Sequence, residues 1–221
     1  MRIVAISDTH EKHRDLDPPP GDVLVHAGDV TWRGELDIFR DFDAWCVEQK
    51  REKGFRHVLL IGGNHDYSLE RAGKPALTTI GNCTYLEDSG VEIEGIRFWG
   101  SPWTNRFLDW AFMEDEAGLA PKWEKIPANT DVLLTHGPPR FIMDRVPRDE
   151  NVGSASLRAR IDAIRPPVHV FGHIHEGYGI ETHGATTFVN ASSCDEGYEA
   201  VNAPLVFDID PKTRAITVPG R

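Results

Sequence analysis

Short hydrophobic runs, each ending at a group of polar residues, recur along the whole chain. Residues 2–7 (RIVAIS) place four apolar residues between Arg2 and Ser7, as in a strand that is covered on both faces. The same pattern predicts further strands at residues 22–27, 56–61, 84–86, 91–93, 96–100, 131–135, 168–172, 179–182, 187–190, 205–210 and 215–218. Glu94 and Gly95 form a plausible hairpin turn, and the strands after residue 178 are expected to form one closing sheet.

Two segments have the three-to-four-residue spacing of an amphipathic helix. Residues 35–53 place Leu36, Phe39 and Phe42 on one face, with acidic residues early and basic residues late. Residues 154–164 fit a second helix that Pro166 and Pro167 end. By contrast, residues 101–112 (SPWTNRFLDWAF) are rich in aromatic residues and interrupted by proline, which favours a loop that walls a pocket.

Length and composition indicate an α/β protein with a single domain, residues 1–221. A chain of 221 residues with 40% hydrophobic residues can bury a full core. No stretch approaches the length of a membrane span, and the first ten residues do not resemble a signal peptide. We therefore expect a soluble, cytoplasmic protein with no membrane partner. Cys46, Cys83 and Cys194 are widely spaced and form no CxxC pattern, so they are expected to be reduced, packed thiols.

The charge of the chain limits the kinds of partner that it is expected to bind. It has 24 basic and 35 acidic side chains, a net charge of −11, which disfavours binding to duplex nucleic acid. The negative charge does not disfavour a small anionic ligand that is bound through metal ions. The oligomeric state is left open.

Metal-ligand side chains follow the ends of several predicted strands. They are Asp8, His10, Asp29, Asn64, Asp66, His136, His173 and His175. In a layered α/β protein the carboxyl ends of parallel strands meet at one edge, so these residues are expected to converge there. Carboxylate, imidazole and carboxamide without thiolate suit Mn, Fe, Zn or Co, and the set is too large for one ion. Two ions about 3.5 to 4 Å apart would suit in-line displacement at phosphorus, which points to phosphate ester hydrolysis.

The blocks DTH, GDV, GNHD, THGPP and GHIH occur in this order, each after a predicted strand. This arrangement resembles the calcineurin-like metallophosphoesterase superfamily. Residues 101–112, 122–139 and 168–209 are similar to its metallophosphoesterase-domain-containing (MPPED) branch. The resemblance implies a two-sheet mixed β-sandwich flanked by helices, with the active site at the C-terminal ends of the strands.

The resemblance also implies a role for each ligand. Asp8, His10 and His175 would bind the first ion, and Asn64, His136 and His173 the second. Asp29 would bridge the two ions. His65 would be the general acid, and Asp66 would orient it through a hydrogen bond.

The predicted function is a dinuclear phosphodiesterase that acts on small diesters through a metal-activated hydroxide. Cyclic nucleotides are the leading substrate class because the resembling branch is associated with them, and Mn²⁺ is the expected metal. A phosphomonoesterase, and a nucleotide-binding or scaffold protein with slow turnover, remain as alternatives.

Several other residues have two readings. Trp103, Phe107 and Trp110 would either stack on a nucleobase or belong to an aromatic core, and Asn64 and His65 would also touch substrate. His26, His57 and His169 fall within strand patterns and are expected to be packed or edge residues, whereas His13 and His183 are expected in surface loops. The resemblance alone places Asn190 and Ser193 beside the site.

Overall fold

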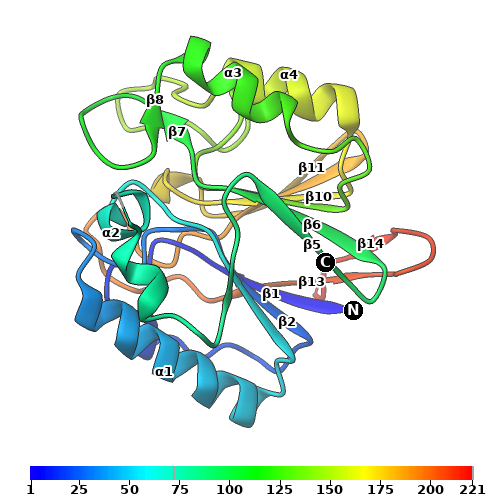
Figure 1. The fold of residues 1–221 in the computed structure, drawn as a ribbon. Helices are drawn as coiled ribbons and strands as arrows, with labels where there is room; N and C mark the ends of the chain where they lie inside the picture. Colours follow the sequence, from blue (N-terminus) through cyan, green and yellow to red (C-terminus); the bar gives the residue numbers. More distant parts are fainter. Residues whose placement is uncertain (72, 221) are drawn as a thin grey trace.

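Two six-stranded mixed β-sheets lie face to face at the centre of the computed structural model, which describes residues 1–71 and 73–220 (Figure 1). The first sheet has the order β14-β13-β1-β2-β3-β4. Its strands are β1 (Arg2–Ile6), β2 (Val23–His26), β3 (His57–Leu60), β4 (Thr84–Tyr85), β13 (Leu205–Ile209) and β14 (Ile216–Thr217). β1 to β4 pair in parallel, and β13 and β14 pair antiparallel.

The second sheet has the order β11-β12-β10-β9-β6-β5. Its strands are β5 (Ser89–Ile93), β6 (Ile96–Ser101), β9 (Val132–Thr135), β10 (Val168–Phe171), β11 (Gly179–His183) and β12 (Thr186–Asn190). The four inner strands are parallel, and the hairpin strands β5 and β11 are antiparallel to their neighbours. A separate short pair joins β7 (Thr104–Asn105) to β8 (Met113–Glu114).

Helices cover the outer face of each sheet. α1 (Leu36–Lys53) packs on the first sheet, and α3 (Glu116–Glu124) and α4 (Ala155–Ile164) pack on the second (Figure 1). α2 (Tyr67–Glu70) and three 3₁₀ turns (His13–Asp15, Pro75–Thr78 and His175–Gly177) complete the helical structure of the described residues. Gly54 ends α1 in the left-handed region at φ 80°, and the Ser154 side chain caps α4 by accepting the N–H of Leu157.

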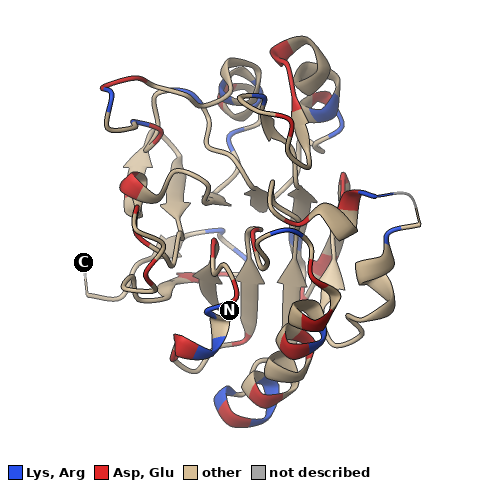
Figure 2. Cartoon of the chain, turned by 90° about the vertical axis from the view of Figure 1, so that its left-hand side faces the viewer, with Lys and Arg blue, Asp and Glu red and all other residues tan. Residues whose placement is uncertain are grey.

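Successive strand residues face different parts of the core. Ile3 and Ala5 of β1 point between the two sheets, where they meet residues such as Val170 of β10. Val4 and Ile6 point the other way, into the cluster beneath α1. Because both faces of the central strands are buried, the strands read as continuous apolar runs. Figure 2 shows the charged residues mainly on the outer helices and loops.

The carboxyl ends of the parallel strands in both sheets meet at one edge of the molecule. Ser7, just after β1, forms a parallel bridge with Ser192, just after β12. The N–H of Ser193 donates to the carbonyl of Ser7 at 2.8 Å. The loops that follow the strands of one sheet therefore lie against those of the other.

The predicted two-sheet mixed α/β architecture is confirmed, and each predicted strand and helix is present with small differences at its ends. The expectation of one closing sheet is wrong, because β11 and β12 join the second sheet whereas β13 and β14 join the first. α3 was not predicted, because Gly118 and Pro121 interrupt the pattern of a helix-forming segment. Within the segment 101–112, Ser101 ends β6 and residues 104–105 form β7, and the rest is a loop. All three cysteines are free.

No helix in residues 1–71 and 73–220 combines the length and the hydrophobicity that crossing a membrane requires.

Candidate metal centre

The seven predicted metal ligands all lie on loops that follow strand ends. Asp8 and His10 follow β1, Asp29 follows β2 and Asn64 follows β3. From the second sheet, His136 follows β9, and His173 and His175 follow β10. The two groups are joined directly, because the backbone N–H of His173 donates to the Asp8 carboxylate at 3.0 Å.

Four of these residues have an unusual backbone conformation. The φ angles of Asp8, His10, Asp29 and His173 are 50°, 42°, 60° and 68°. Residues other than glycine rarely adopt this left-handed backbone conformation, and those that do concentrate at functional sites. The loops thus accept local strain in order to turn these side chains toward one another.

One group of ligands surrounds Asp8. The ligand atoms of Asp8, His10 and His175 lie within 4.8 Å of one another. The Nδ1 atom of His175 donates to the carbonyl of Asp195 at 2.8 Å, which turns Nε2 toward Asp8 Oδ1, 3.5 Å away. These are the three residues that the family resemblance assigns to the first ion.

A second group surrounds His136. Its Nε2 atom lies 3.3 Å from Asp29 Oδ2 and 2.9 Å from Asn64 Oδ1. Its Nδ1 atom donates to the carbonyl of Ala27 at 2.9 Å. The ring of His173 packs against that of His136 with centroids 5.0 Å apart. The residues assigned to the second ion are therefore also brought together.

Asp29 belongs to both halves of the centre. Its carboxylate forms one potential ligand group with Asp8 and His136 and another with His10 and His65. Asp29 is buried beneath these side chains. This central position is the one that a bridging carboxylate requires.

Burial and neighbouring charges act in opposite directions on the titratable groups of this set. Burial disfavours charged His136, but the Asp29 carboxylate outweighs it and raises the pKa of His136 to about 9. Burial also disfavours charged His175, but the Asp8 carboxylate outweighs burial and raises the pKa of His175 to about 9. Although burial opposes ionisation of Asp29, the neighbouring histidines lower its pKa. Metal binding would displace these protons.

The residues present fit divalent metal ions. Both ring nitrogens of His10 are buried without a hydrogen-bond partner among the described residues. A buried polar atom without a partner is costly, and a metal ion would satisfy one of these nitrogens. The donors are carboxylate, imidazole and carboxamide, which suit divalent transition metals.

His65 lies at the edge of the centre with a defined orientation. Its Nδ1 atom is 2.9 Å from the carbonyl oxygen of Trp32 and must donate to it, because a carbonyl only accepts. Nε2 consequently faces the centre, 4.0 Å from Asp29 Oδ2. This position suits a general acid. It also places His65 in one potential ligand group with His10 and Asp29, whose ligand atoms lie within 4.8 Å of one another.

The expectation that Asp66 orients His65 through a hydrogen bond is wrong. The Asp66 carboxylate instead accepts backbone N–H groups from Asp29, Val30, Thr31 and Gly63. Trp32 supplies the contact that orients His65. Asp66 therefore shapes the loop that carries Asp29.

A cavity of about 610 Å³ opens over the metal centre. His10, Asp29, Asn64, His65, His173 and His175 line its inner part. Phe107, Trp110, Tyr198, Arg106, Arg140 and Arg148 are among its other lining residues. Phe107 is 63% exposed, so its ring is available to a ligand. Loop 101–112 thus contributes to the cavity.

Trp103, the other aromatic residue predicted to touch substrate, does not line this cavity. Its ring packs edge-on against Phe112 with centroids 5.5 Å apart, and Lys122 Nζ lies 3.2 Å from its centroid. The core reading holds for Trp103, whereas Phe107 and Trp110 face the cavity.

The remaining histidines mostly lie as expected. His26 and His169 are buried in strands, His57 is half-buried at the start of β3, and His183 is exposed. His13 is the exception, because it is fully buried against Phe42 and Trp45 and lies 3.0 Å from Asp41. A single turn after His10 is enough to carry it under α1.

Ser192, which the sequence did not single out, touches a predicted ligand. Its Oγ lies 3.0 Å from Asp8 Oδ2 and 2.8 Å from Asn190 Oδ1. Asn190 is therefore linked to Asp8 through the Ser192 hydroxyl. The Oγ of Ser193 has no hydrogen-bond partner among the described residues. Trp32 and Tyr198 were also missed, although both fall inside or beside the family-like blocks GDV and 168–209.

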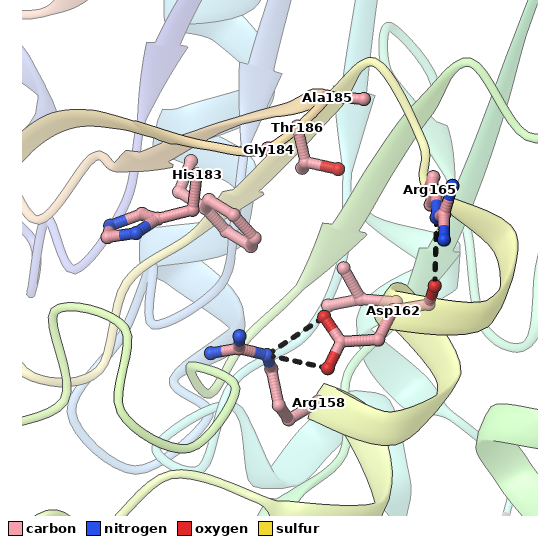
Figure 3. Close-up of a pocket in the computed structure, with 9 residues that line it drawn as sticks. Arg158, Asp162, Arg165, His183, Gly184, Ala185 and Thr186 are labelled. Atoms are coloured by element: carbon pink, nitrogen blue, oxygen red, sulfur yellow. Dashed lines mark hydrogen bonds and ion pairs between the residues drawn. The ribbon is translucent and has the colours of Figure 1, made fainter.

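A second hollow, of about 290 Å³, lies between α4 and the β11–β12 turn (Figure 3). Its Arg158 is paired with Asp162 at 3.0 Å. Thr186 begins β12, whereas Asn190 at the other end of that strand lies near the centre. This hollow is therefore at the far end of the strands from the metal centre.

Known proteins resemble this chain over most of its length. A family model described as calcineurin-like phosphoesterase matches residues 1–177. Metallophosphoesterase domain-containing protein 1 of Homo sapiens is 36% identical over 234 residues, covering 94% of this chain and 71% of the human protein. UPF0046 protein K07C11.7 of Caenorhabditis elegans is 36% identical over 228 residues, covering 96% of this chain and 77% of the nematode protein.

A solved structure agrees on the fold. The crystal structure of TT1561 of Thermus thermophilus matches with a TM-score of 0.58 and 15% identity, covering 98% of this chain and 96% of that chain. At this identity the likeness concerns the fold alone.

Proposed function

This chain belongs to the calcineurin-like phosphoesterase family, and from that premise we propose that it is a dinuclear metal-dependent phosphodiesterase that hydrolyses small phosphodiesters. Cyclic nucleotides are the leading substrate class. Members of this family use divalent metals, and Mn²⁺ is the metal we propose here. The proposed site of action is the cytoplasm, with a small phosphodiester or nucleotide as partner.

The observation that carries this proposal is the shared position of Asp29. Its carboxylate reaches the ligand groups of both ions, so the chain has the ligands for a pair rather than for one ion. When bound, two divalent ions supply activation of the attacking water and neutralise charge on the phosphoryl oxygens. Asp8, His10 and His175 would hold one ion, and Asn64, His136 and His173 the other.

His65 is the residue proposed to protonate the leaving oxygen. Its Nδ1 proton is held by the Trp32 carbonyl, so the proton that it donates must be on Nε2, the nitrogen that faces the centre. The ring must therefore carry protons on both nitrogens before the ester bond breaks. Trp110 packs edge-on against His65 with centroids 4.3 Å apart and restricts its ring.

The cavity walls support a nucleotide rather than a bare phosphate. Phe107 and Trp110 present aromatic surface beside the metal centre. Stacking of a base on such a ring is worth about 1 to 3 kcal/mol. The chain also carries a net charge of −11, which argues against a long nucleic-acid duplex as substrate.

The test is a metal-reconstitution assay. The protein is stripped with chelator, reloaded with Mn²⁺ and given a chromogenic phosphodiester, 2′,3′- and 3′,5′-cyclic nucleotides and a chromogenic monoester. We expect turnover of a diester that depends on added metal. Activity on the monoester alone would make the protein a phosphomonoesterase. If no ester is turned over in a metal-dependent way, the proposal of an enzyme is overturned, and a nucleotide-binding or scaffold protein remains.

A further inference from the structure

His10 differs from His65, His136 and His175 in how its ring is held. His65, His136 and His175 each donate from Nδ1 to a backbone carbonyl at 2.8 to 2.9 Å. Such a hydrogen bond normally fixes the tautomer and the orientation of a metal-binding histidine. Neither ring nitrogen of His10 has a hydrogen-bond partner in residues 1–71 and 73–220. A metal ion on one nitrogen would still leave the other without an acceptor.

Aromatic rings surround His10 instead. The Trp32 ring lies over it, tilted by 31° with centroids 4.6 Å apart. The Tyr198 ring meets it edge-on at 83°, with centroids 5.0 Å apart. Trp32 and Tyr198 also contact each other at 4.7 Å. Trp32 follows β2, whereas Tyr198 lies in the loop between β12 and β13, so the two rings meet over His10 only in the folded protein.

The loop that carries Tyr198 is itself tightly held. Tyr198 is in the left-handed region at φ 61°, and its N–H donates to the Asp195 carbonyl at 2.9 Å. The carbonyl of Tyr198 accepts a hydrogen bond from Lys12 Nζ at 2.7 Å. The same Asp195 carbonyl accepts the Nδ1 proton of His175. The Tyr198 ring also touches His175, with centroids 5.3 Å apart. One turn thus holds both histidines that are assigned to the first ion.

We propose that Trp32 and Tyr198 form an aromatic clamp, which sets the ring orientation of His10 in place of a hydrogen bond and thereby determines the affinity for the first ion. Trp32 and Tyr198 are positioning residues, because they act through His10. The proposal rests on the metal centre of the proposed function. It assigns the work to the rings, so the Tyr198 hydroxyl is not required.

The test measures metal affinity without any substrate. Metal-stripped protein is titrated with Co²⁺, and binding is followed by calorimetry and by the visible absorbance of the bound ion. Tyr198→Ala is expected to weaken one of the two binding steps by about 10- to 100-fold, the range seen when an outer partner of a ligand is removed. Tyr198→Phe, which retains the ring, is expected to remain within about threefold of the unaltered protein.

Tyr178→Ala is the matched control. Tyr178 lies close to His175 in sequence, but its hydroxyl bonds the carbonyl of Ala203, and no ring contact joins it to the described metal ligands. Both metal affinities should be unchanged in this variant. Trp32→Leu removes the other half of the clamp and should weaken the same step as Tyr198→Ala.

Two results would overturn the clamp. One is a folded Tyr198→Ala protein that binds both ions within twofold of the original affinity. The other is a Tyr198→Phe protein as weak as Tyr198→Ala, because the hydroxyl would then be the important group. If Tyr198→Ala does not fold, Trp32→Leu decides by the same affinity criterion. Absence of turnover on every ester would overturn the proposed function and leave this result standing.

Discussion

The carboxylate of Asp66 accepts the backbone N–H of Asp29 at 2.8 Å. It also accepts the N–H groups of Thr31 and Gly63, each at 3.0 Å. Burial and the nearby Asp29 charge raise the pKa of Asp66 to about 6, so it is mainly ionised at neutral pH and remains an acceptor. Asp66 therefore ties the loop after β2, which carries the shared metal ligand, to the turn after β3.

Replacing this carboxylate should cost both stability and metal affinity. In Asp66→Asn an NH₂ group faces N–H donors, so we expect the free energy of unfolding to fall by about 2 kcal/mol and both metals to bind more weakly. Urea unfolding and metal titration measure the two effects. Asp144→Asn is the control, because Asp144 accepts the N–H groups of Phe141 and Gly153 in another loop. It should lose stability while keeping metal affinity, and equal metal loss in both variants would contradict the role of Asp66.

Asp29→Asn should empty both metal positions. Asp29 is the carboxylate that the two ligand groups share, so removing its charge weakens both sites at once. We expect metal content to fall from about two equivalents to below one, as measured by elemental analysis after gel filtration. The exposed Asp109→Asn protein serves as control. Unchanged metal content in Asp29→Asn would show that Asp29 does not bridge.

His65→Ala should retain the metals and lose activity. Loss of a general acid costs about 10²- to 10⁴-fold in kcat. The loss should be large for a cyclic nucleotide, whose leaving alkoxide needs a proton, and small for a nitrophenyl ester, whose leaving group does not. Steady-state kinetics on both substrates measure this difference. Loss of bound metal instead would make His65 a ligand with His10 and Asp29.

Gly172→Ala should disrupt the centre from the backbone. A Cβ atom on Gly172 would overlap the Asp8 carboxylate and the Ser7 hydroxyl. We expect the variant to lose metal binding and to unfold at lower temperature, by circular dichroism and metal titration. Gly81→Ala is the control, because nothing lies within 4 Å of an added Cβ there. Normal metal affinity in Gly172→Ala would contradict the close packing of the turn after β10 against Asp8.

His169 should make the protein sensitive to mild acid. The Thr135 hydroxyl donates to the Gly137 carbonyl, so His169 Nε2 must donate to Thr135, and its Nδ1 is bare and without a partner among the described residues. Burial lowers the pKa of His169 from 6.5 to about 3. Between these values the unfolded chain binds a proton that the native protein does not, so stability falls as the pH falls below 6.5.

The size of this effect is about 1.4 kcal/mol per pH unit. We expect His169→Gln to lose roughly 2 kcal/mol less than the unaltered protein between pH 6.5 and about pH 5. Urea unfolding across this range measures the difference in slope. Parallel curves for the two proteins would mean that His169 is not neutral in the native state.

The sequence by itself determined the central strands and the kinds of ligand. Buried parallel strands need continuous apolar residues, so β1, β2, β9 and β10 could be read directly from the chain. Asp8, Asp29 and His136 follow these strands, and the common direction of parallel strands brings their ends together. These are local patterns, and local chemistry is enough to read them.

Only the tertiary structure decided which groups touch. Asp66 was expected to hold the His65 ring, but the carbonyl of Trp32 holds it. Trp32 and Tyr198 meet over His10 from loops far apart in the chain, and His13 is buried by the packing of α1. Likewise, β11 and β13 were expected in one sheet but join different sheets. Such contacts join residues distant in the chain and depend on how two sheets pack, for which hydrophobic periodicity has no signal.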